Sequence, residues 1–345
     1  MQCTLLIPHL FWPGDAADAV ARDLRLPAIS KLLARARCDR LPAITPEAWL
    51  CQAFGIERQH DWPIAPLTLE IDGSEPLDAY WLRADPVHLK VTRDRLLLVD
   101  NTLFDLALDE ARSMSDTLNR HFGEQRITFH TPQAKRWYAK LARAPELVTH
   151  PIREAAGQDV QHYLPSGAEG LAWHRIFNEV QMLLHEHPVN ESREARGDPP
   201  VNSVWFWGGG TRPVVRGRPF HGVWSDNDAA IAIGAAAHSR TGAAPSNAET
   251  WLASVARSGN RSESHLIMLD AIGAAVAYHD SDAWRARIVQ LDAQWLAPLL
   301  TALREGRIAL ITLVALGKES SGRFVASRPD LLKLWRRPQS LSAYA

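Results

Sequence analysis

The stretch HEHPVNESREARGDPPVNSVWFWGGG, residues 185–210, gathers residue types that can bind an anion. Asn190 and Arg193 can hold phosphate or carboxylate oxygens through amide and charge-assisted hydrogen bonds, and the prolines stiffen the loop that presents them. The glycines at 208–210 permit a close backbone approach to a ligand. The same residues also suit an architectural role, in which Asn190 and Asn202 cap turns and Arg193 anchors the loop to a sheet. The sequence leaves both roles open. The ligand-binding candidates are Asn190, Arg193, Asn202, Gly208, Gly209, Gly210 and Arg212.

Two pairs of residues have the chemistry of a metal site. His185 and His187 form an H-x-H pair, and His279 is followed directly by Asp280. Imidazole and carboxylate groups bind zinc and similar cations, so a relocated single-metal centre is one hypothesis. A structural role is the alternative, because a histidine near a helix C-terminus interacts favourably with the helix dipole. His221 and His238 have no such spacing.

The segment TRPVVRGRP carries a small basic cluster of Arg212, Arg216 and Arg218. Such a cluster can receive an anionic group, but basic residues at this spacing also occur on ordinary solvated surfaces.

The hydrophobic pattern predicts the elements that must position these residues. Residues 3–11 form a continuous apolar run ended by Pro-Gly, which is typical of a central parallel strand covered on both faces. Residues 26–41 predict an amphipathic helix with Ile29 and Leu32 on its apolar face. A second helix is expected to begin at Pro46 and to stop at Gly55.

The rest of the chain shows two different patterns of predicted strands and helices. Residues 65–150 alternate short strands with one helix, which indicates a compact inserted domain. From 151 onward, helices and strands alternate, with the strand SVWFW following a long helix. That order is typical of doubly wound sheets, where ligands bind beyond the carboxyl ends of the strands.

The composition is that of an ordinary globular protein. The 38 basic and 39 acidic residues nearly balance, which argues against a broad nucleic-acid footprint. Three cysteines without a CxxC motif indicate a reducing compartment, and no apolar run reaches the length of a membrane span. We therefore expect a cytoplasmic protein without nucleic-acid or membrane partners. The thirteen tryptophans predict core and interface packing, with an aromatic binding surface as the alternative.

The segment HPVNESREARGDPPVNSVWFWGGGTRP resembles the signature of the archaeal-type cofactor-independent phosphoglycerate mutases, members of the alkaline phosphatase superfamily. LPAISKLLARARC, AYWLRADPVHLKV and DSDAWRARIVQLDAQWLAPLL are similar to other parts of that family's plan. WFWGGG and DPVHL also resemble a narrower group, the bacterial RpfE-type regulatory proteins. The residues in register with the signature are His187, Pro188, Asn190, Arg193, Gly197, Pro200, Asn202 and Gly208.

The resemblance implies an α/β fold with a doubly wound, alkaline-phosphatase-like central sheet, helices on both faces and a smaller inserted α+β domain. We expect the core to comprise residues 1–64 and 151–345, and the insertion to comprise residues 65–150.

The resemblance also implies two metal ions, a Ser or Thr nucleophile and a set of Asp and His ligands. The nucleophile's place falls on Thr45, and Asp270-Ala-Ile-Gly273 resembles the start of a D-x-x-G-H segment. Ala274 stands in place of that histidine, and Pro8 or His9 stands where the first strand should end in Asp-Gly.

Further metal ligands are missing near the end of the chain. Ala315-Leu316-Gly317 replaces the Asp-His pair expected after a late strand, and no histidine follows His279. The inherited two-metal site is therefore incomplete, with Asp270 as a remnant ligand.

Three functional hypotheses follow, of which the third is a purely structural or partner-binding protein whose tryptophans form an interface. The leading hypothesis is a catalytically degenerate, regulatory or ligand-binding protein without a metal cofactor, which binds a small phosphorylated or carboxylated metabolite or a protein partner. The alternative is an active phosphomutase or phosphoesterase that uses manganese or zinc at a rearranged site containing Thr45, Asp270, His279 and Asp280.

Overall fold

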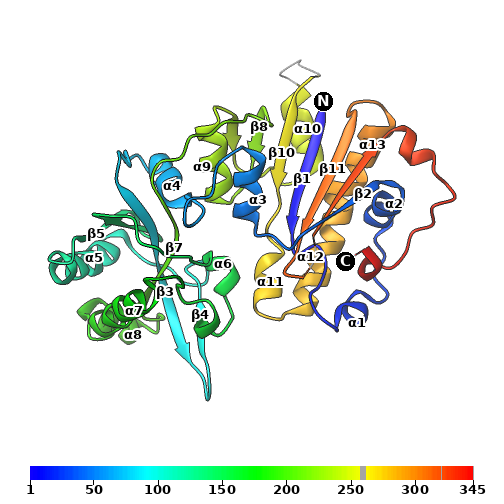
Figure 1. Ribbon diagram of the computed structural model, residues 1–345. Helices are drawn as coiled ribbons and strands as arrows, with labels where there is room; N and C mark the ends of the chain where they lie inside the picture. The colour runs from blue at the N-terminus through cyan, green and yellow to red at the C-terminus, as the bar shows by residue number, and fades with distance from the viewer. Residues whose placement is uncertain (257–261, 320, 345) are drawn as a thin grey trace. The chain divides into compact units, whose positions relative to one another are not determined.

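The computed structural model describes residues 1–256, 262–319 and 321–344 of the chain. The chain divides into two compact units (Figure 1). Unit 1 comprises Met1–Gly55 and Arg216–Ala345, and unit 2 comprises Ile56–Val215.

Unit 1 is built around a mixed seven-stranded sheet in the order β2-β12-β11-β1-β10-β8-β9. β1 lies between β10 and β11 and is parallel to both, and β8 and β9 continue the parallel part. β12 is antiparallel to both β11 and β2. The strands are β1 (Gln2–Pro8), β2 (Arg37–Leu41), β8 (Gly222–Trp224), β9 (Arg240–Gly242), β10 (Ser264–Met268), β11 (Leu310–Leu316) and β12 (Ser321–Ser327).

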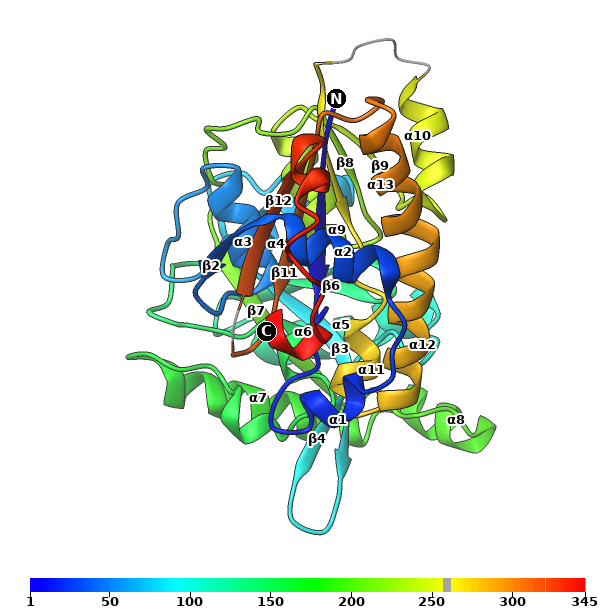
Figure 2. The same ribbon diagram turned by 90° about the vertical axis from the view of Figure 1, so that its right-hand side faces the viewer.

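Helices cover both faces of this sheet. Alternate residues of β1, among them Leu5 and Ile7, join the core formed with α2, α10, α12 and α13. α10, α12 and α13 lie on one side of the sheet and α3 on the other (Figure 2). The helices are α1 (Ala17–Ala21), α2 (Pro27–Arg35), α3 (Pro46–Ala53), α9 (Asp228–Ala236), α10 (Ala248–Ala256), α11 (Gly273–Ala277), α12 (Ser281–Leu291) and α13 (Ala297–Arg304). This confirms the α/β fold class and the central strand predicted from the first apolar run.

A π-helical turn, Asp292–Leu296, joins α12 to α13. It carries the buried Asp292 carboxylate to the start of α2, where Oδ1 accepts a hydrogen bond from Ile29 N at 2.6 Å and Oδ2 accepts one from Ala28 N at 3.3 Å. α2 has no capping side chain of its own at Leu26, so Asp292 takes over the capping role from another helix.

The predicted helix over residues 26–41 is correct only in its first part. α2 ends at Arg35, Ala36 is extended, and residues 37–41 form the edge strand β2. β2 pairs with β12, and this tertiary pairing overrides the local preference for helix.

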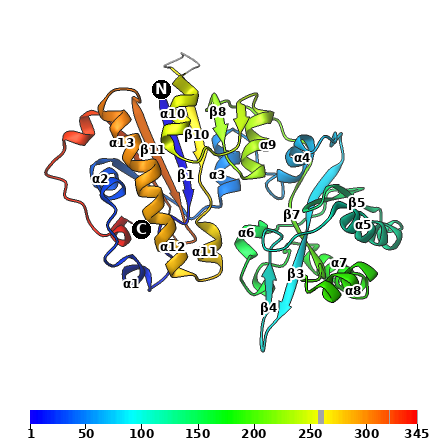
Figure 3. The same cartoon turned by 180° about the vertical axis from the view of Figure 1, so that it is seen from behind.

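Unit 2 contains a smaller antiparallel sheet, in which the long strand β3 pairs with β4, β6 and β7 (Figure 3). Its strands are β3 (Tyr80–Val91), β4 (Leu96–Val99), β5 (Ile127–Gln133), β6 (Arg136–Leu141) and β7 (Ser203–Gly210). Its helices are α4 (Ile64–Ile71), α5 (Leu108–Phe122), α6 (Ile152–Ala155), α7 (Gly170–His185) and α8 (Pro188–Arg196).

The extent of unit 2 differs from the predicted insertion of residues 65–150. β7 pairs antiparallel with β3 from Ser203 to Gly210, so α7, α8 and β7 belong to unit 2 rather than to the doubly wound core. The SVWFWGGG run is buried at every position. A continuous apolar run indicates that a strand is buried on both faces, but it does not indicate which strands pair with it. For this reason the prediction that this strand belongs to the doubly wound sheet was wrong.

Within the described residues, no helix is both long and apolar enough to cross a lipid bilayer.

Candidate functional site

The carboxyl edge of the unit 1 sheet brings together residues from distant parts of the chain. β1, β8, β10 and β11 are mutually parallel, so His9, Asn227 and Asp270 follow strands that end at the same edge. β2 runs in the same direction as β11 because both are antiparallel to β12, so Thr45 follows a strand end at this edge as well. Open α/β sheets bind their ligands at this edge, which makes it the candidate site.

The main chain turns sharply at the end of β1. His9 has a left-handed backbone with φ 60°, a conformation that glycine adopts far more readily than histidine. His9 N donates to Leu316 O at 2.7 Å, and Trp284 Nε1 donates to His9 O at 3.0 Å. A Cβ built on Gly273 would lie 3.6 Å from His9 Cδ2, so the imidazole lies beside the start of α11.

Asn227 is the polar centre of this edge. Its side chain is buried, its Oδ1 caps α9 by accepting from Ala230 N at 3.1 Å, and its Nδ2 donates to Asp270 Oδ2 at 3.5 Å. Ser225 Oγ accepts from Asn227 N at 3.0 Å and fixes the turn. Asp270 is half-buried and lies two residues beyond the end of β10, beside Asn227.

Thr45 caps the N-terminus of α3. Its Oγ1 accepts a hydrogen bond from Ala48 N at 3.1 Å, and Pro46 occupies the first helical position. This is the behaviour of an ordinary N-cap threonine, and it also leaves the hydroxyl at the positive end of a helix dipole.

The two remaining metal candidates have local structural roles. Asp280 caps α12, since its Oδ1 accepts from Ala283 N at 2.9 Å, and both Asp280 and His279 are exposed. His279 makes the left-handed turn between α11 and α12 with φ 56°. Among the described residues, no three His, Cys, Asp or Glu side chains are grouped closely enough to hold a metal ion together.

The H-x-H pair is not assembled as a metal site. His185 is exposed at the end of α7, whereas His187 is buried and caps α8 through Nδ1, which accepts from Val189 N at 3.2 Å. The Nε2 of His187 lies 3.1 Å from Thr117 Oγ1, and burial lowers the pKa of the imidazole. Both ring nitrogens of His187 are therefore engaged, which favours the structural role.

Asn190 also has an architectural role. Its Nδ2 donates to Leu184 O at 2.6 Å and to Val201 O at 2.9 Å, while its Oδ1 accepts from Val201 N at 2.9 Å. The buried amide therefore ties the end of α7 to the segment leading into β7. A ligand could use this side chain only by displacing these backbone bonds, which favours the architectural role of Asn190 over the ligand-binding role.

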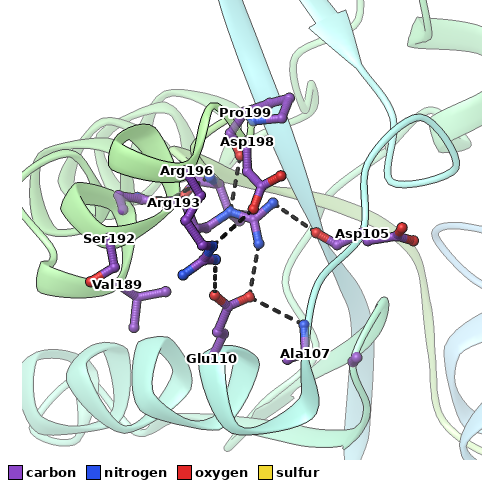
Figure 4. Close-up of polar contacts among 12 residues, drawn as sticks. Asp105, Ala107, Glu110, Val189, Ser192, Arg193, Arg196, Asp198 and Pro199 are labelled. Atoms are coloured by element: carbon purple, nitrogen blue, oxygen red, sulfur yellow. Dashed lines mark hydrogen bonds and ion pairs between the residues drawn. The ribbon is translucent and has the colours of Figure 1, made fainter.

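Arg193 is the anchor of the α8 loop (Figure 4). The side chain is 1% exposed. Its Nε donates to Pro199 O at 3.0 Å, Nη2 to Asp105 O at 2.7 Å and Nη1 to Glu110 Oε2 at 2.8 Å. All three nitrogens of the guanidinium are thus engaged by protein acceptors, which again supports the architectural alternative over anion binding.

Glu110 connects α5 to α8 through two arginines. Its second carboxylate oxygen accepts from Arg196 Nη2 at 2.7 Å. Burial alone would raise the pKa of Glu110, but the hydrogen bonds from Arg196 and Ala107 and the charge of Arg193 lower it overall. The carboxylate is therefore held ionised between two cations.

Asn202 and the three glycines of the 185–210 stretch have roles in the packing of unit 2. Asn202 pairs with Leu89 like a strand residue, with Oδ1 accepting from Leu89 N at 2.7 Å and Nδ2 donating to Leu89 O at 2.9 Å. A Cβ on Gly209 would lie 2.4 Å from Tyr80 Oη, and one on Gly210 would lie 2.4 Å from Pro63 Cβ. Gly208 has φ 67°, and a Cβ there would lie 3.0 Å from that of Ile64. The glycines permit tight packing within unit 2 rather than the approach of a ligand.

The basic cluster is on the surface. Arg212 is exposed and forms an ion pair with Glu70. Arg216 and Arg218 are also exposed, as expected for a solvated face.

Sequence reasoning did not identify Ser225 and Asn227. The signal was present in the run Ser225-Asp-Asn-Asp228 directly ahead of an alanine-rich helix, which is an N-cap pattern. Their importance comes from β8 lying beside β10, a pairing that the sequence pattern alone does not reveal.

Comparisons with known proteins identify relatives for part of the chain. No family model matches. The chain is 29% identical to a 2,3-bisphosphoglycerate-independent phosphoglycerate mutase of Methanosarcina barkeri over 168 residues, which is 46% of this chain and 42% of the relative. It is 31% identical over 121 residues to a protein of the same description from Methanothermobacter thermautotrophicus, covering 34% of this chain and 30% of the relative. The matched segments thus span less than half the length of these curated relatives.

Solved structures extend the likeness to the whole fold. The PH0037 protein of Pyrococcus horikoshii has a TM-score of 0.59 at 12% identity, covering 99% of this chain and 91% of that one. The cofactor-independent phosphoglycerate mutase of Thermoplasma acidophilum has a TM-score of 0.50 at 13% identity, covering 100% and 94%. The chain is therefore similar to 2,3-bisphosphoglycerate-independent phosphoglycerate mutases in sequence over the matched segments, and it shares its fold with the two solved structures.

Proposed function

We propose that this phosphoglycerate mutase-like chain has lost two-metal phosphoryl transfer and acts as a non-catalytic ligand-binding or regulatory protein. The observation that carries the proposal is the set of residues at the carboxyl edge of the unit 1 sheet. Pro8 is the last residue of β1 and His9 follows it, Gly317 and Lys318 follow β11, and Ala274 occupies the first turn of α11. These positions supply one imidazole and no carboxylate.

The backbone at the end of β1 supports the same proposal. The resemblance places Asp-Gly here, and the left-handed φ of His9 is the conformation expected of the glycine. Pro8 then occupies the place of the aspartate, and proline has no metal-binding side chain. Replacement of Asp-Gly by Pro8-His9 would therefore remove a metal-binding carboxylate while the left-handed turn is kept.

The residues at this edge do not fit the two-metal set that the resemblance implies. Asp270 is bonded to Asn227, an amide rather than a second carboxylate, and Asp280 is engaged in capping α12. Phosphoryl transfer of this type relies on its cations to neutralise transition-state charge, so an incomplete set should cost several kcal/mol of catalysis.

The edge keeps features that suit a small anionic ligand. The N-termini of α3 and α9 are at this edge, where backbone N–H groups and the helix dipole favour phosphate or carboxylate groups. Asn227 caps α9 and donates to Asp270, so it positions the residues around these helix ends. A small phosphorylated or carboxylated metabolite is therefore the proposed ligand class.

The test uses 3-phosphoglycerate as the probe. We expect calorimetry to detect binding that persists in EDTA and weakens in Asn227→Ala, while the exposed Asp282→Asn variant on α12 binds as the wild type does. We expect no turnover of the probe with added manganese. Metal-dependent turnover would contradict the proposal, as would probe binding that Asn227→Ala leaves unchanged.

A second candidate is an active phosphomutase or phosphoesterase with a rearranged site. It is favoured by one observation, that Thr45 stands at the N-terminus of α3 at the same sheet edge as Asp270. This candidate predicts turnover that is lost in Thr45→Ala and kept in Thr45→Ser.

A further inference from the structure

Three of the most exposed large apolar side chains in the described residues lie within one short segment. Leu332, Leu334 and Trp335 are 73%, 72% and 76% exposed, whereas the other exposed apolar side chains occur singly along the chain. Single exposed apolar residues are normal, but a local group of them marks an interaction surface.

Trp335 is the exception among the thirteen tryptophans of this protein. The other twelve are buried or half-buried, in keeping with their predicted packing role. A Trp left three-quarters exposed beside two exposed leucines is poorly explained by folding alone.

Cations flank the apolar group. Residues 328–337 contain Arg328, Lys333, Arg336 and Arg337 against Asp330, a net charge of +3 from four cations and one carboxylate. Lys333 Nζ donates to Asp330 Oδ1 at 2.6 Å. Arg328 and Arg337 are exposed to solvent.

The segment is held in place by hydrogen bonds and by the buried side chain of Leu331. Arg336 Nη1 donates to Ala36 O at 3.0 Å, Arg35 Nη1 donates to Leu331 O, and Asp330 accepts from Ser327 N at 2.8 Å. Because these contacts fix the backbone, the exposed leucines and Trp335 are displayed outward in a preformed arrangement.

We propose that residues 328–337 form a peripheral contact surface for an anionic lipid bilayer. The indole and leucine side chains enter the interfacial layer, and the arginines contact lipid phosphates. Tryptophan is suited to this layer because it combines an apolar ring with one N–H donor, and each nearby basic residue strengthens attraction to an anionic leaflet. This surface differs from the candidate site, does not depend on the proposed function, and departs from the expectation of no membrane partner, which rested on the lack of a spanning segment.

The test is co-sedimentation of the whole protein with vesicles of phosphatidylcholine alone or mixed with phosphatidylglycerol. We expect binding to the mixed vesicles that weakens as salt is added, because salt screens the arginines. Trp335→Ser should abolish binding, and Arg337→Ala should reduce the partition coefficient about fivefold.

Two matched variants control for charge and apolarity elsewhere. Leu171→Ser removes an equally exposed apolar side chain from α7, and Arg287→Ala removes an exposed cation from α12, so both should bind as the wild type does. Equal thermal unfolding midpoints will show that all variants are folded. Failure to bind the mixed vesicles would overturn the proposal and leave an acidic protein surface as the occupant, and so would binding that Trp335→Ser does not affect.

Discussion

Single residues that looked catalytic from the sequence are found in structural contacts. Thr45 was predicted as a nucleophile and is observed as the N-cap of α3. Asn190 and Arg193 match the family signature, and the structure shows their polar atoms bonded to backbone and to Glu110. Residues of a family signature can therefore stabilise a loop even in a protein whose catalytic residues differ from those of the family.

Substitution of Thr45 separates its two roles. Thr45→Ala removes the cap and should lower the free energy of unfolding by about 1 kcal/mol, whereas Thr45→Asn restores a capping oxygen without a nucleophile and should cost little. Urea unfolding followed by circular dichroism measures both. Equal loss in the two variants would contradict the capping role.

Gly209 gives a second test at this scale. An alanine there would collide with Tyr80 Oη and with Leu82 Cδ2, which lies 2.7 Å from the added Cβ, so Gly209→Ala should destabilise the protein by about 1 to 3 kcal/mol. Among the described residues the Tyr80 hydroxyl has no hydrogen-bond partner, so Tyr80→Phe should be nearly neutral and should relieve part of the cost. A double-mutant cycle measures the relief, and strict additivity of the two changes would count against this packing.

At the scale of elements, buried polar contacts fix how helices and strands meet. Glu110 on α5 accepts from both Arg193 and Arg196 on α8. The two arginines differ in exposure, 1% and 51% of their side chains, and this decides their contributions.

Arg193→Met should cost about 3 kcal/mol of unfolding free energy because it leaves buried acceptors unpaired. Arg196→Met removes an exposed partner of the same carboxylate and should cost less than about 1 kcal/mol. Denaturant unfolding of the two variants compares them directly. Similar losses in both would show that burial does not govern this network.

His265 on β10 makes stability depend on pH. Burial lowers its pKa to about 4, outweighing the attraction of Glu263, while Arg240, His221 and the N-terminal amine lower it further. The folded state therefore excludes a proton that the unfolded chain binds near its ordinary pKa of about 6.5. The contribution of His265 to the free energy of unfolding should therefore be fully present above about pH 6.5 and should fall by about 3 kcal/mol as the pH drops to about 4.

The check is unfolding free energy measured across that window. His265→Asn does not titrate and should flatten the pH dependence, whereas the same change at the exposed His238 should leave it as in the wild type. A wild-type slope in His265→Asn would rule out His265 as the source.

At the scale of the whole molecule, the sequence predicted the fold class, the central strand and an inserted unit, but not the bounds of the two units. The first apolar run forms a central parallel strand, as predicted, and it lies between β10 and β11. The SVWFWGGG run has the same apolar texture but pairs antiparallel with β3, and its glycines pack against Tyr80 and Pro63. Apolarity reports burial, whereas strand partners are set by tertiary contacts that a single sequence does not display.

The candidate site was predicted in part for the same reason. Thr45 and Asp270 could be identified from the resemblance, because Thr45 directly precedes a recognisable helix and Asp270 follows a recognisable strand. Asn227 could not, since its contact with Asp270 depends on β8 lying next to β10. The absence of a histidine after His279 needed no structure at all.

The central claim is that the carboxyl edge of the unit 1 sheet no longer holds a pair of divalent cations. Its most direct test is the metal content of the protein after incubation with manganese or zinc and removal of unbound metal. We predict substoichiometric metal that is unchanged in Asp270→Asn. A stoichiometric pair of ions per chain, lost in Asp270→Asn, would contradict the account.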